Sequence, residues 1–252
     1  MAEQPGLDIS PFSFPGGPTG CLLIHGFTSA PPETRPMGEY LAGRGLTILG
    51  LRLPGHGTTP DDLIRTTWRD WISAAEQGLA DLQSRCQKVF VAGVSMGGLL
   101  TLHLAERQSV AGIIPMAAAL DVSSRRVAWA PLLQYFIKTK PKGPPEAGDW
   151  QDPTAYLRHW SYSVYPIKSI ADLTALRRRV RANIRRVAAP ALIIHGQRDA
   201  AVPPASAQWL YDHISSPDKS ILWLPNSGHC VTIDAERQRV WQSAYDFIQA
   251  HA

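Results

Sequence analysis

A continuous apolar run, typical of a buried strand, and a hydrophobic pattern with helical spacing meet at one short turn of the chain. The first is the continuous apolar run Val89–Val94, and the second is a helical pattern over Gly97–Glu106. The turn between them reads Gly-Val-Ser-Met-Gly, residues 93–97. When a strand reverses sharply into a helix, the residue at the apex is strained, and neighbours without side chains avoid a collision with the turn. We therefore expect the Ser95 hydroxyl to stand exposed at the carboxyl edge of a sheet.

An ordinary helix could also begin with a serine, as an N-cap. The apolar strand directly before the pentapeptide favours the sharp turn over a simple cap. In that turn the backbone N–H of Met96 points into the same space as the serine hydroxyl, at a helix N-terminus where negative charge is favoured. Ser95 is thus a candidate nucleophile.

Apolar strand patterns alternate with helical patterns along most of the chain. The expected strands and apolar runs are Cys21–Ile24, Thr47–Leu53, Val89–Val94, Val110–Ala117, Ala191–Ile194 and Ser220–Leu224. The expected helices are Met37–Ala42, Trp68–Arg85, Gly97–Glu106, Ser206–Ile214 and Ala235–His251. Strands separated by helices predict an α/β fold with a mostly parallel central sheet flanked by helices.

Residues 121–189 interrupt this alternation and are rich in aromatic side chains. We interpret them as a small inserted cap, mostly helical, on a core domain formed by residues 1–120 and 190–252. The rings can line a pocket under the cap or simply fix the cap to the core, and the sequence leaves both open. The proposed substrate contacts among them are Trp129, Phe136, Trp150 and Tyr162.

A neutral serine needs a base to take its proton. Where a serine stands at the apex of such a turn, the acid and then the histidine come later in the chain. Of the later histidines, His159 falls in the cap, His195 ends a strand, His213 lies in a helix and His251 lies at the terminus. His229 lies in a loop directly after a strand, so it is our candidate base.

The acid holds the histidine in the correct tautomer and stabilises the imidazolium that forms. Asp199 follows the expected strand Ala191–Ile194, and we prefer it. Asp121 is the rival because it follows the preceding apolar run, although it also suits a turn or a helix cap. Asp234 comes after His229, so the residue order excludes it.

Acyl transfer from an ester passes through an oxyanion, which two preorganised backbone N–H groups usually stabilise. Met96 supplies one of them. The second is expected in the loop after the first buried strand, His-Gly-Phe-Thr at residues 25–28, and we assign it to Phe27. His25 is expected to order that loop rather than to react.

Composition argues against several classes of protein. The net charge is +4, and the one basic run, residues 177–186, alternates with apolar residues at helical spacing, so its arginines form a solvated helix face rather than a nucleic-acid site. No apolar run reaches the roughly 18 residues that span a bilayer. No secretory signal is evident. The scattered cysteines, Cys21, Cys86 and Cys230, show neither metal-ligand nor disulfide spacing, which favours free thiols in the cytoplasm.

Five motifs in one order carry a resemblance to a known family. They are the loop at residues 25–28, Pro-Gly-His-Gly at 54–57, the turn at 93–97, the segment 196–203 and Ser-Gly-His at 227–229. The chain resembles bacterial carboxylesterases and monoacylglycerol lipases of the α/β-hydrolase fold, and especially the small thermophile-type carboxylesterases.

The resemblance implies a serine carboxylic ester hydrolase that forms an acyl-enzyme, with no cofactor and no metal. The implied partner is a small-molecule ester with a short to medium acyl chain, and the oligomeric state stays open. Three alternatives remain. One is a monoacylglycerol lipase, the second is a carbon–carbon bond hydrolase that shares the serine turn, and the third is a non-enzymatic binding protein on this fold.

Overall fold

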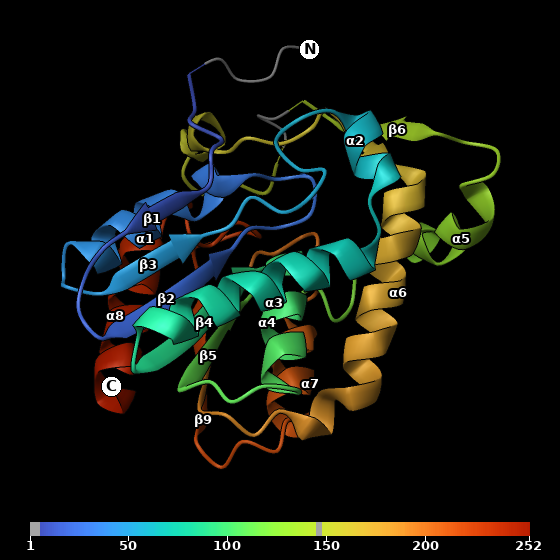
Figure 1. Ribbon diagram of the computed structural model, residues 1–252. Helices are drawn as coiled ribbons and strands as arrows, with labels where there is room; N and C mark the ends of the chain where they lie inside the picture. Colours follow the sequence, from blue (N-terminus) through green and yellow to red (C-terminus); the bar gives the residue numbers. More distant parts are fainter. Residues whose placement is uncertain (1–5, 145–147) are drawn as a thin grey trace.

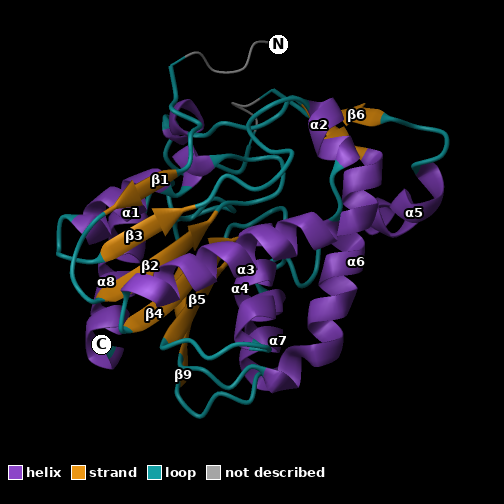
Figure 2. Ribbon diagram, viewed as in Figure 1, coloured by secondary structure: helices purple, strands orange, loops and turns teal. Residues whose placement is uncertain are grey.

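The computed structural model describes residues 6–144 and 148–252, apart from the side chains of residues 125 and 126. A seven-stranded sheet lies at its centre, in the strand order β1-β3-β2-β4-β5-β8-β9 (Figures 1 and 2). The strands are β1 Phe12–Phe14, β2 Thr19–Ile24, β3 Thr47–Gly50, β4 Lys88–Val94, β5 Gly112–Met116, β8 Ala191–Gly196 and β9 Lys219–Leu224. All neighbours run parallel except β1, which pairs antiparallel with β3.

Helices cover both faces of this sheet. On one face lie α1 and α8, and on the other lie α3, α4 and α7 (Figure 1). Their bounds are α1 Arg35–Ala42, α3 Trp68–Arg85, α4 Met96–Ala105, α7 Ala205–His213 and α8 Arg237–His251. A mostly parallel sheet between two helical layers confirms the predicted fold class.

Alternation along the strands divides the core into two halves. In β2, Leu22 and Ile24 join the cluster under α3 and α4, whereas Cys21 and Leu23 join the cluster under α1 and α8. All four are fully buried. A strand buried on both faces is apolar throughout, which is why these segments read as continuous apolar runs.

Residues 121–189, the predicted cap, contain helices and one strand pair. Its elements are η2 Arg125–Trp129, α5 Ala130–Leu133, β6 Thr139–Pro141, η4 Ala155–Arg158, β7 Val164–Pro166, α6 Ile167–Asn183 and η5 Ile184–Arg186. β6 pairs antiparallel with β7, and α6 packs against α3 and α4. The limits 121 and 189 stay a prediction.

The arginine-rich run lies in and just after α6. Its apolar members, such as Val180 and Ile184, are buried, and Arg185 and Arg186 are exposed, as expected of an amphipathic helix. Arg181 donates a hydrogen bond to Leu120 O at 2.9 Å, so part of the basic run serves packing. No helix among the described residues is long and apolar enough to cross a membrane.

Short elements escaped the sequence patterns. β1, α2 (Pro60–Arg65) and η1 (Pro31–Glu33) span only three to six residues, too few to show a period. The expected strand Thr47–Leu53 ends early, at Gly50. Leu53, the last residue of the expected strand, lies outside the sheet, and its N–H donates to His25 Nε2 at 3.1 Å.

Replacement of a central aromatic residue should cost far more stability than replacement of an exposed one. Phe90 in β4 is fully buried and packs against Phe247, with ring centroids 6.1 Å apart. Phe90→Ala should lower the free energy of unfolding by about 3–5 kcal/mol. The matched control Phe136→Ala, at a site 80% exposed, should change it by less than about 0.5 kcal/mol. Urea unfolding followed by circular dichroism measures both, and equal effects would contradict this packing.

Candidate active site

Three non-glycine residues with positive φ stand at the carboxyl edge of the sheet. Thr28 follows β2 with φ 62°, Ser95 follows β4 with φ 55°, and Ala117 follows β5 with φ 44°. Such backbone is costly for residues with a Cβ and persists only where the surroundings enforce it. The Ser95 N–H donates to Met116 O at 2.9 Å, and Ser95 O accepts from Ala119 N at 3.2 Å, so neighbouring loops hold the strained serine.

The glycines of the turn are required by close approach. A Cβ on Gly97 would lie 2.1 Å from Ile24 O, and one on Gly93 would lie 2.3 Å from Gly97 O. Both distances are shorter than any van der Waals contact, so β4 and α4 can meet at this angle only with glycine at these positions. The turn leaves Ser95 9% exposed at the edge of the sheet.

His229 and Asp199 form a hydrogen-bonded pair at the same edge. His229 Nδ1 lies 2.8 Å from Asp199 Oδ2. The other carboxylate oxygen accepts from Ala201 N at 2.9 Å and from Val202 N at 2.8 Å. Burial alone would raise the pKa of Asp199, but the charge of His229 and the hydrogen bonds from His195, His229 and Val202 N hold it well below its usual range. An ionised Asp199 accepts the Nδ1–H, which leaves Nε2 of a neutral His229 free to act as a base.

A second histidine also faces this carboxylate. His195 Nε2 lies 3.3 Å from Asp199 Oδ2 and 3.1 Å from Val202 O. A carbonyl oxygen only accepts, so this nitrogen carries a proton and donates. His195 thereby helps to fix the carboxylate that His229 contacts.

The rival acid lies elsewhere. Asp121 is exposed, and its carboxylate accepts a hydrogen bond from the neighbouring Val122 N at 2.8 Å. This is the role in a turn that the sequence also suggested for Asp121. Asp234 is fully buried and bonds Gly228 N at 2.7 Å, so it holds the loop of His229 rather than its ring.

Asp149, from the cap, is a site residue that sequence reasoning missed. Its Oδ2 accepts from His229 N at 3.1 Å and from Ala200 N at 2.8 Å, so one oxygen joins the loops of both members of the pair. Burial would lower the pKa of His229, yet the carboxylates of Asp199, Asp149 and Glu33 raise it above its ordinary value. No motif surrounds Asp149 in the sequence, because it acts through a contact between distant segments.

The loop after β2 runs beside the serine. A Cβ on Gly26 would lie 3.4 Å from Ser95 Cβ, and Gly26 N donates to Glu33 Oε2 at 2.6 Å. Phe27 follows, with its ring against Trp71 at a centroid distance of 6.1 Å. Met96 is the first residue of α4, where backbone N–H groups lack a partner within the helix. The two expected oxyanion donors therefore belong to segments that flank Ser95.

His25 has a structural environment. It is fully buried, its Nε2 accepts from Leu53 N at 3.1 Å, and its Nδ1 lies 2.9 Å from Gly26 O. Burial lowers the pKa of His25 to about 4, so the ring is neutral. It joins the loops after β2 and β3.

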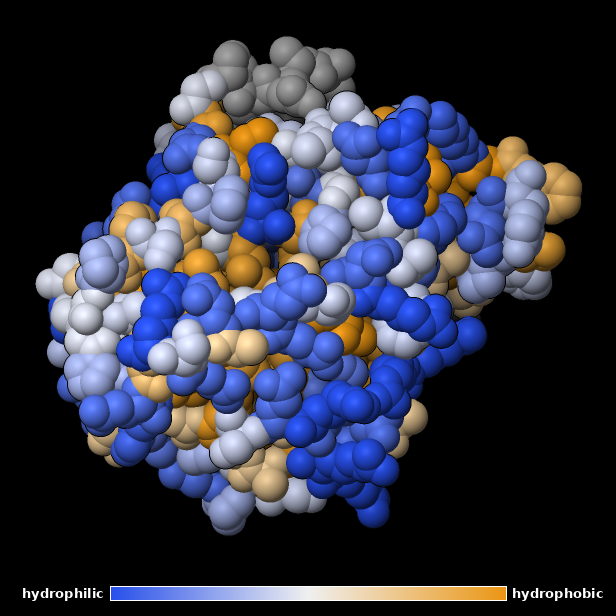
Figure 3. Space-filling view, in the orientation of Figure 1, coloured by the Kyte–Doolittle hydropathy of each residue, from blue (hydrophilic) through white to orange (hydrophobic). Residues whose placement is uncertain are grey.

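The four predicted substrate contacts occupy different environments. Trp129 and Phe136 are 63% and 80% exposed and lie close to α5 in the sequence. α5 is at the right edge of the molecule (Figure 1), where hydrophobic residues reach the surface (Figure 3). Tyr162 is buried, and its hydroxyl bonds Gly55 O at 2.8 Å, which ties the cap to the core. Trp150 packs its ring against His159 at 5.4 Å. The structure does not gather these rings around one point, and their role in binding stays a prediction.

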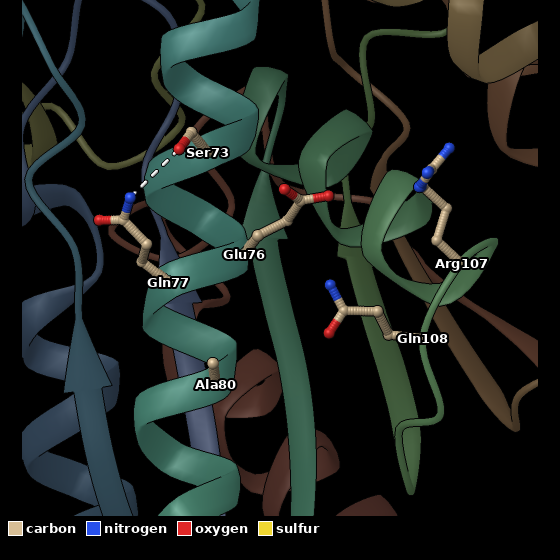
Figure 4. A pocket seen from close by; sticks show the side chains of 6 residues that line it. All are labelled: Ser73, Glu76, Gln77, Ala80, Arg107 and Gln108. Carbon is tan, nitrogen blue, oxygen red and sulfur yellow. Dashed lines mark hydrogen bonds between the residues drawn. The ribbon is translucent and has the colours of Figure 1, made fainter.

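A surface hollow between α3 and the end of α4 is unrelated to this site. Figure 4 shows its lining, in which Gln77 donates to Ser73 at 3.2 Å and the side chains of Glu76, Arg107 and Gln108 reach toward the same space. It is shallow and polar, and it shares no residue with the edge where Ser95 lies.

Comparisons with known proteins agree with this geometry. A model of the Hydrolase_4 family, described as serine aminopeptidase S33, matches residues 19–236. The chain is 36% identical to a thermostable monoacylglycerol lipase of Bacillus sp. (strain H-257), over 100% of both chains. It is 30% identical to a carboxylesterase of Bacillus subtilis (strain 168), over 95% of this chain and 96% of that one.

Solved structures agree in fold. A chain from work on LipS and LipT, two metagenome-derived lipolytic enzymes, superposes with a TM-score of 0.89 and 32% identity, covering 96% of this chain and 98% of the other. A monoacylglycerol lipase of Paleococcus ferrophilus superposes with a TM-score of 0.84 at 21% identity, covering 98% and 100%. The family model and the relatives that are at least 30% identical confirm the family that the motifs indicated.

The charge of Asp149 should be measurable at the ring of His229. Asp149→Asn keeps an oxygen that can accept from both amides but removes a negative charge that favours the imidazolium, so the pKa of His229 should fall. Titration of the ring by NMR measures it directly. The control Asp121→Asn, which removes an equal charge from an exposed residue, should change this pKa less. An unchanged or raised pKa in Asp149→Asn would refute this electrostatic role.

Proposed function

Because this chain belongs to the Hydrolase_4 family of α/β hydrolases and is a carboxylic ester hydrolase, we propose a serine mechanism for it. Ser95 is the nucleophile, His229 the general base and Asp199 the acid. The substrates are esters with short to medium acyl chains. Its full-length similarity to a carboxylesterase and a monoacylglycerol lipase favours ester cleavage over carbon–carbon cleavage or simple binding.

One observation carries the assignment of roles. The ionised, buried Asp199 binds the Nδ1 side of His229 at 2.8 Å, at the sheet edge where Ser95 stands in strained backbone. This arrangement favours the tautomer that a general base needs, with the proton on Nδ1 and the lone pair on Nε2. A histidine without a carboxylate at its Nδ1 would not be held in this tautomer.

The first half of the reaction forms the acyl-enzyme. His229 Nε2 takes the proton of Ser95 Oγ while the oxygen attacks the ester carbonyl. The backbone N–H groups of Phe27 and Met96 stabilise the oxyanion, assisted by the N-terminus of α4. Collapse of this intermediate breaks the carbon–oxygen bond to the alcohol, which leaves with the proton from His229.

The second half repeats these steps with water. His229 takes a proton from a water molecule, whose oxygen attacks the acyl carbonyl of Ser95. The same two N–H groups stabilise the second oxyanion. The acid then leaves, and the proton on His229 returns to Ser95 Oγ, so no cofactor is consumed.

The cap and the compartment are further parts of the proposal. Trp150, which packs beside His159 close to the His229 loop, suits a wall of the acyl or alcohol pocket. Trp129 and Phe136 face solvent, where they suit first contact with an apolar substrate. Cys21, Cys86 and Cys230 are all free thiols, the state favoured in the cytoplasm.

A monoacylglycerol is the second candidate substrate. The similarity to a thermostable monoacylglycerol lipase at 36% identity over the whole chain favours it. A single acyl chain with a small polar alcohol also suits a short cap better than a triacylglycerol does. The two candidates differ only in the alcohol, so one substrate series tests both.

Loss of tautomer control should separate the two candidate acids. Asp199→Asn should lower kcat for an aryl ester by about 10⁴-fold, because the amide no longer holds the Nδ1–H of His229 and cannot stabilise the imidazolium. The matched control Asp121→Asn should change kcat little. Steady-state kinetics of both variants measure the two effects on kcat. A larger loss of kcat in Asp121→Asn than in Asp199→Asn would identify Asp121 as the acid instead.

The acyl-chain preference should show a maximum. Each methylene that becomes buried contributes about 0.8 kcal/mol, or about fourfold in kcat/KM, until the pocket is full. In a series of aryl esters from acetyl to stearoyl, kcat/KM should rise to medium chains and then fall. Monoacylglycerols of matching chain length should also be cleaved, and emulsified trioleoylglycerol should be poor. A maximum at trioleoylglycerol would overturn the proposed substrate range.

A further inference from the structure

Three side chains of types that bind metals converge beside the His229 loop. Glu33 belongs to η1, His159 follows η4 in the cap, and Cys230 comes directly after His229. Their ligand atoms all lie within 4.8 Å of one another, the one such group of three among the described residues. Glu33 is only 2% exposed and Cys230 only 7%, so this is an interior cluster and not a chance meeting of surface groups.

The separations approach those of a coordination sphere. His159 Nε2 lies 3.7 Å from Glu33 Oε1 and 4.0 Å from Cys230 Sγ. Tetrahedral zinc, with bonds of about 2.0–2.3 Å to nitrogen, oxygen and sulfur, places neighbouring ligands about 3.3–3.6 Å apart. The two separations from His159 therefore exceed these values by only a few tenths of an ångström, and Glu33 and Cys230 lie within 4.8 Å of each other.

The geometry does not suit a second catalytic pair. A cysteine activated by a histidine needs the thiol on one ring nitrogen and the orienting acid on the other. Here the thiol and the carboxylate both face Nε2 of His159.

One ring nitrogen of His159 is placed to bind the ion, because Nε2 is the atom that faces both the carboxylate of Glu33 and the thiol of Cys230. Ser29 Oγ lies 3.3 Å from the same nitrogen and offers an oxygen as a fourth ligand.

Lys142 is the cationic side chain that faces this cluster. It donates to Thr28 Oγ1 at 2.6 Å and to Ser161 Oγ, and burial lowers its pKa to about 8 even though Glu33 and Cys230 oppose that effect. One ammonium balances one negative charge. A divalent cation balances both the carboxylate and the thiolate, so it can displace the proton of Cys230 to solvent.

We propose that Glu33, His159 and Cys230 form a Zn²⁺ site whose occupation inhibits ester hydrolysis. The ion forms a bond to Cys230 Sγ as the thiol proton leaves, and water or Ser29 completes the sphere. It would join His159 of the cap to two core residues. Glu33 also accepts from Gly26 N at 2.6 Å, next to Phe27, and Cys230 adjoins His229. Coordination would therefore displace both the loop of Phe27, a proposed oxyanion donor, and the loop of His229, the proposed base.

Cobalt binding tests the site without reference to activity. Co²⁺ titrated into the full-length wild-type protein should produce thiolate-to-metal absorption, and Zn²⁺ should abolish it by displacement. Cys230→Ser should lose the absorption. Loss of a residue that only hydrogen-bonds to a metal ligand costs about 10–100-fold in metal affinity, so His159→Gln, which removes a ligand itself, should weaken binding by more than that. The matched controls Cys86→Ser and His213→Gln should bind as the wild type does. Absence of the band in the wild type, or its loss in Cys86→Ser instead, overturns the proposal.

An activity measurement tests the inhibitory role, which rests on the proposed function. Zn²⁺ should lower kcat of the wild type and of Cys86→Ser, and a chelator should restore it. His159→Gln should keep its turnover at Zn²⁺ concentrations that silence the wild type. Equal inhibition of His159→Gln would show that the ion acts elsewhere, for example on His229. A protein with no ester turnover at any Zn²⁺ concentration refutes the proposed function, while the cobalt titration still decides the site.

Discussion

The close approach of β4 and α4 to the end of β2 is the constraint on which the site depends. Gly97 lies so near Ile24 O that a Cβ there would be 2.1 Å from it, and a Cβ on Gly93 would be 2.3 Å from Gly97 O. This packing lets a central strand turn at once into a buried helix and leaves Ser95 at the apex with φ 55°. The same contact places the N-terminus of α4 beside the loop after β2, so the positions of the proposed nucleophile and of both proposed oxyanion donors follow from one turn.

Carboxylates organise the other side of the site. Asp199 holds the ring of His229, Asp149 holds its backbone, and Asp234 accepts from Gly228 N at 2.7 Å while it also accepts from Gln151 N at 2.9 Å and Asp152 N at 2.8 Å. Two of these three acids thus connect residues 149–152 to the loop of His229. This segment of the predicted cap therefore helps to position His229, the proposed base, and the charge of Asp149 also acts on its ring.

Sequence reasoning succeeded where the chemistry is local. The strand–turn–helix at Ser95 shows itself in five consecutive residues, and the alternation of strands and helices predicted the layered sheet that the structure has. The pairing of His229 with Asp199 could be anticipated from residue order and from loops that follow parallel strands. Contacts between distant segments could not. Asp149 is 80 residues from His229, and Glu33 meets His159 and Cys230 only in the folded chain. Periodicity also misses β1, because three residues show no period.

The central claim is that Ser95 is the nucleophile, and replacement of its hydroxyl tests that claim most directly. In a pure Ser95→Ala preparation with an unchanged unfolding midpoint, aryl ester turnover should fall by about a million-fold, the size of loss known for a triad nucleophile. Phenylmethylsulfonyl fluoride should add one sulfonyl group to the wild type, on the peptide that contains Ser95, and none to the variant. Wild-type turnover in Ser95→Ala, or an adduct on another serine with loss of activity, would contradict the account.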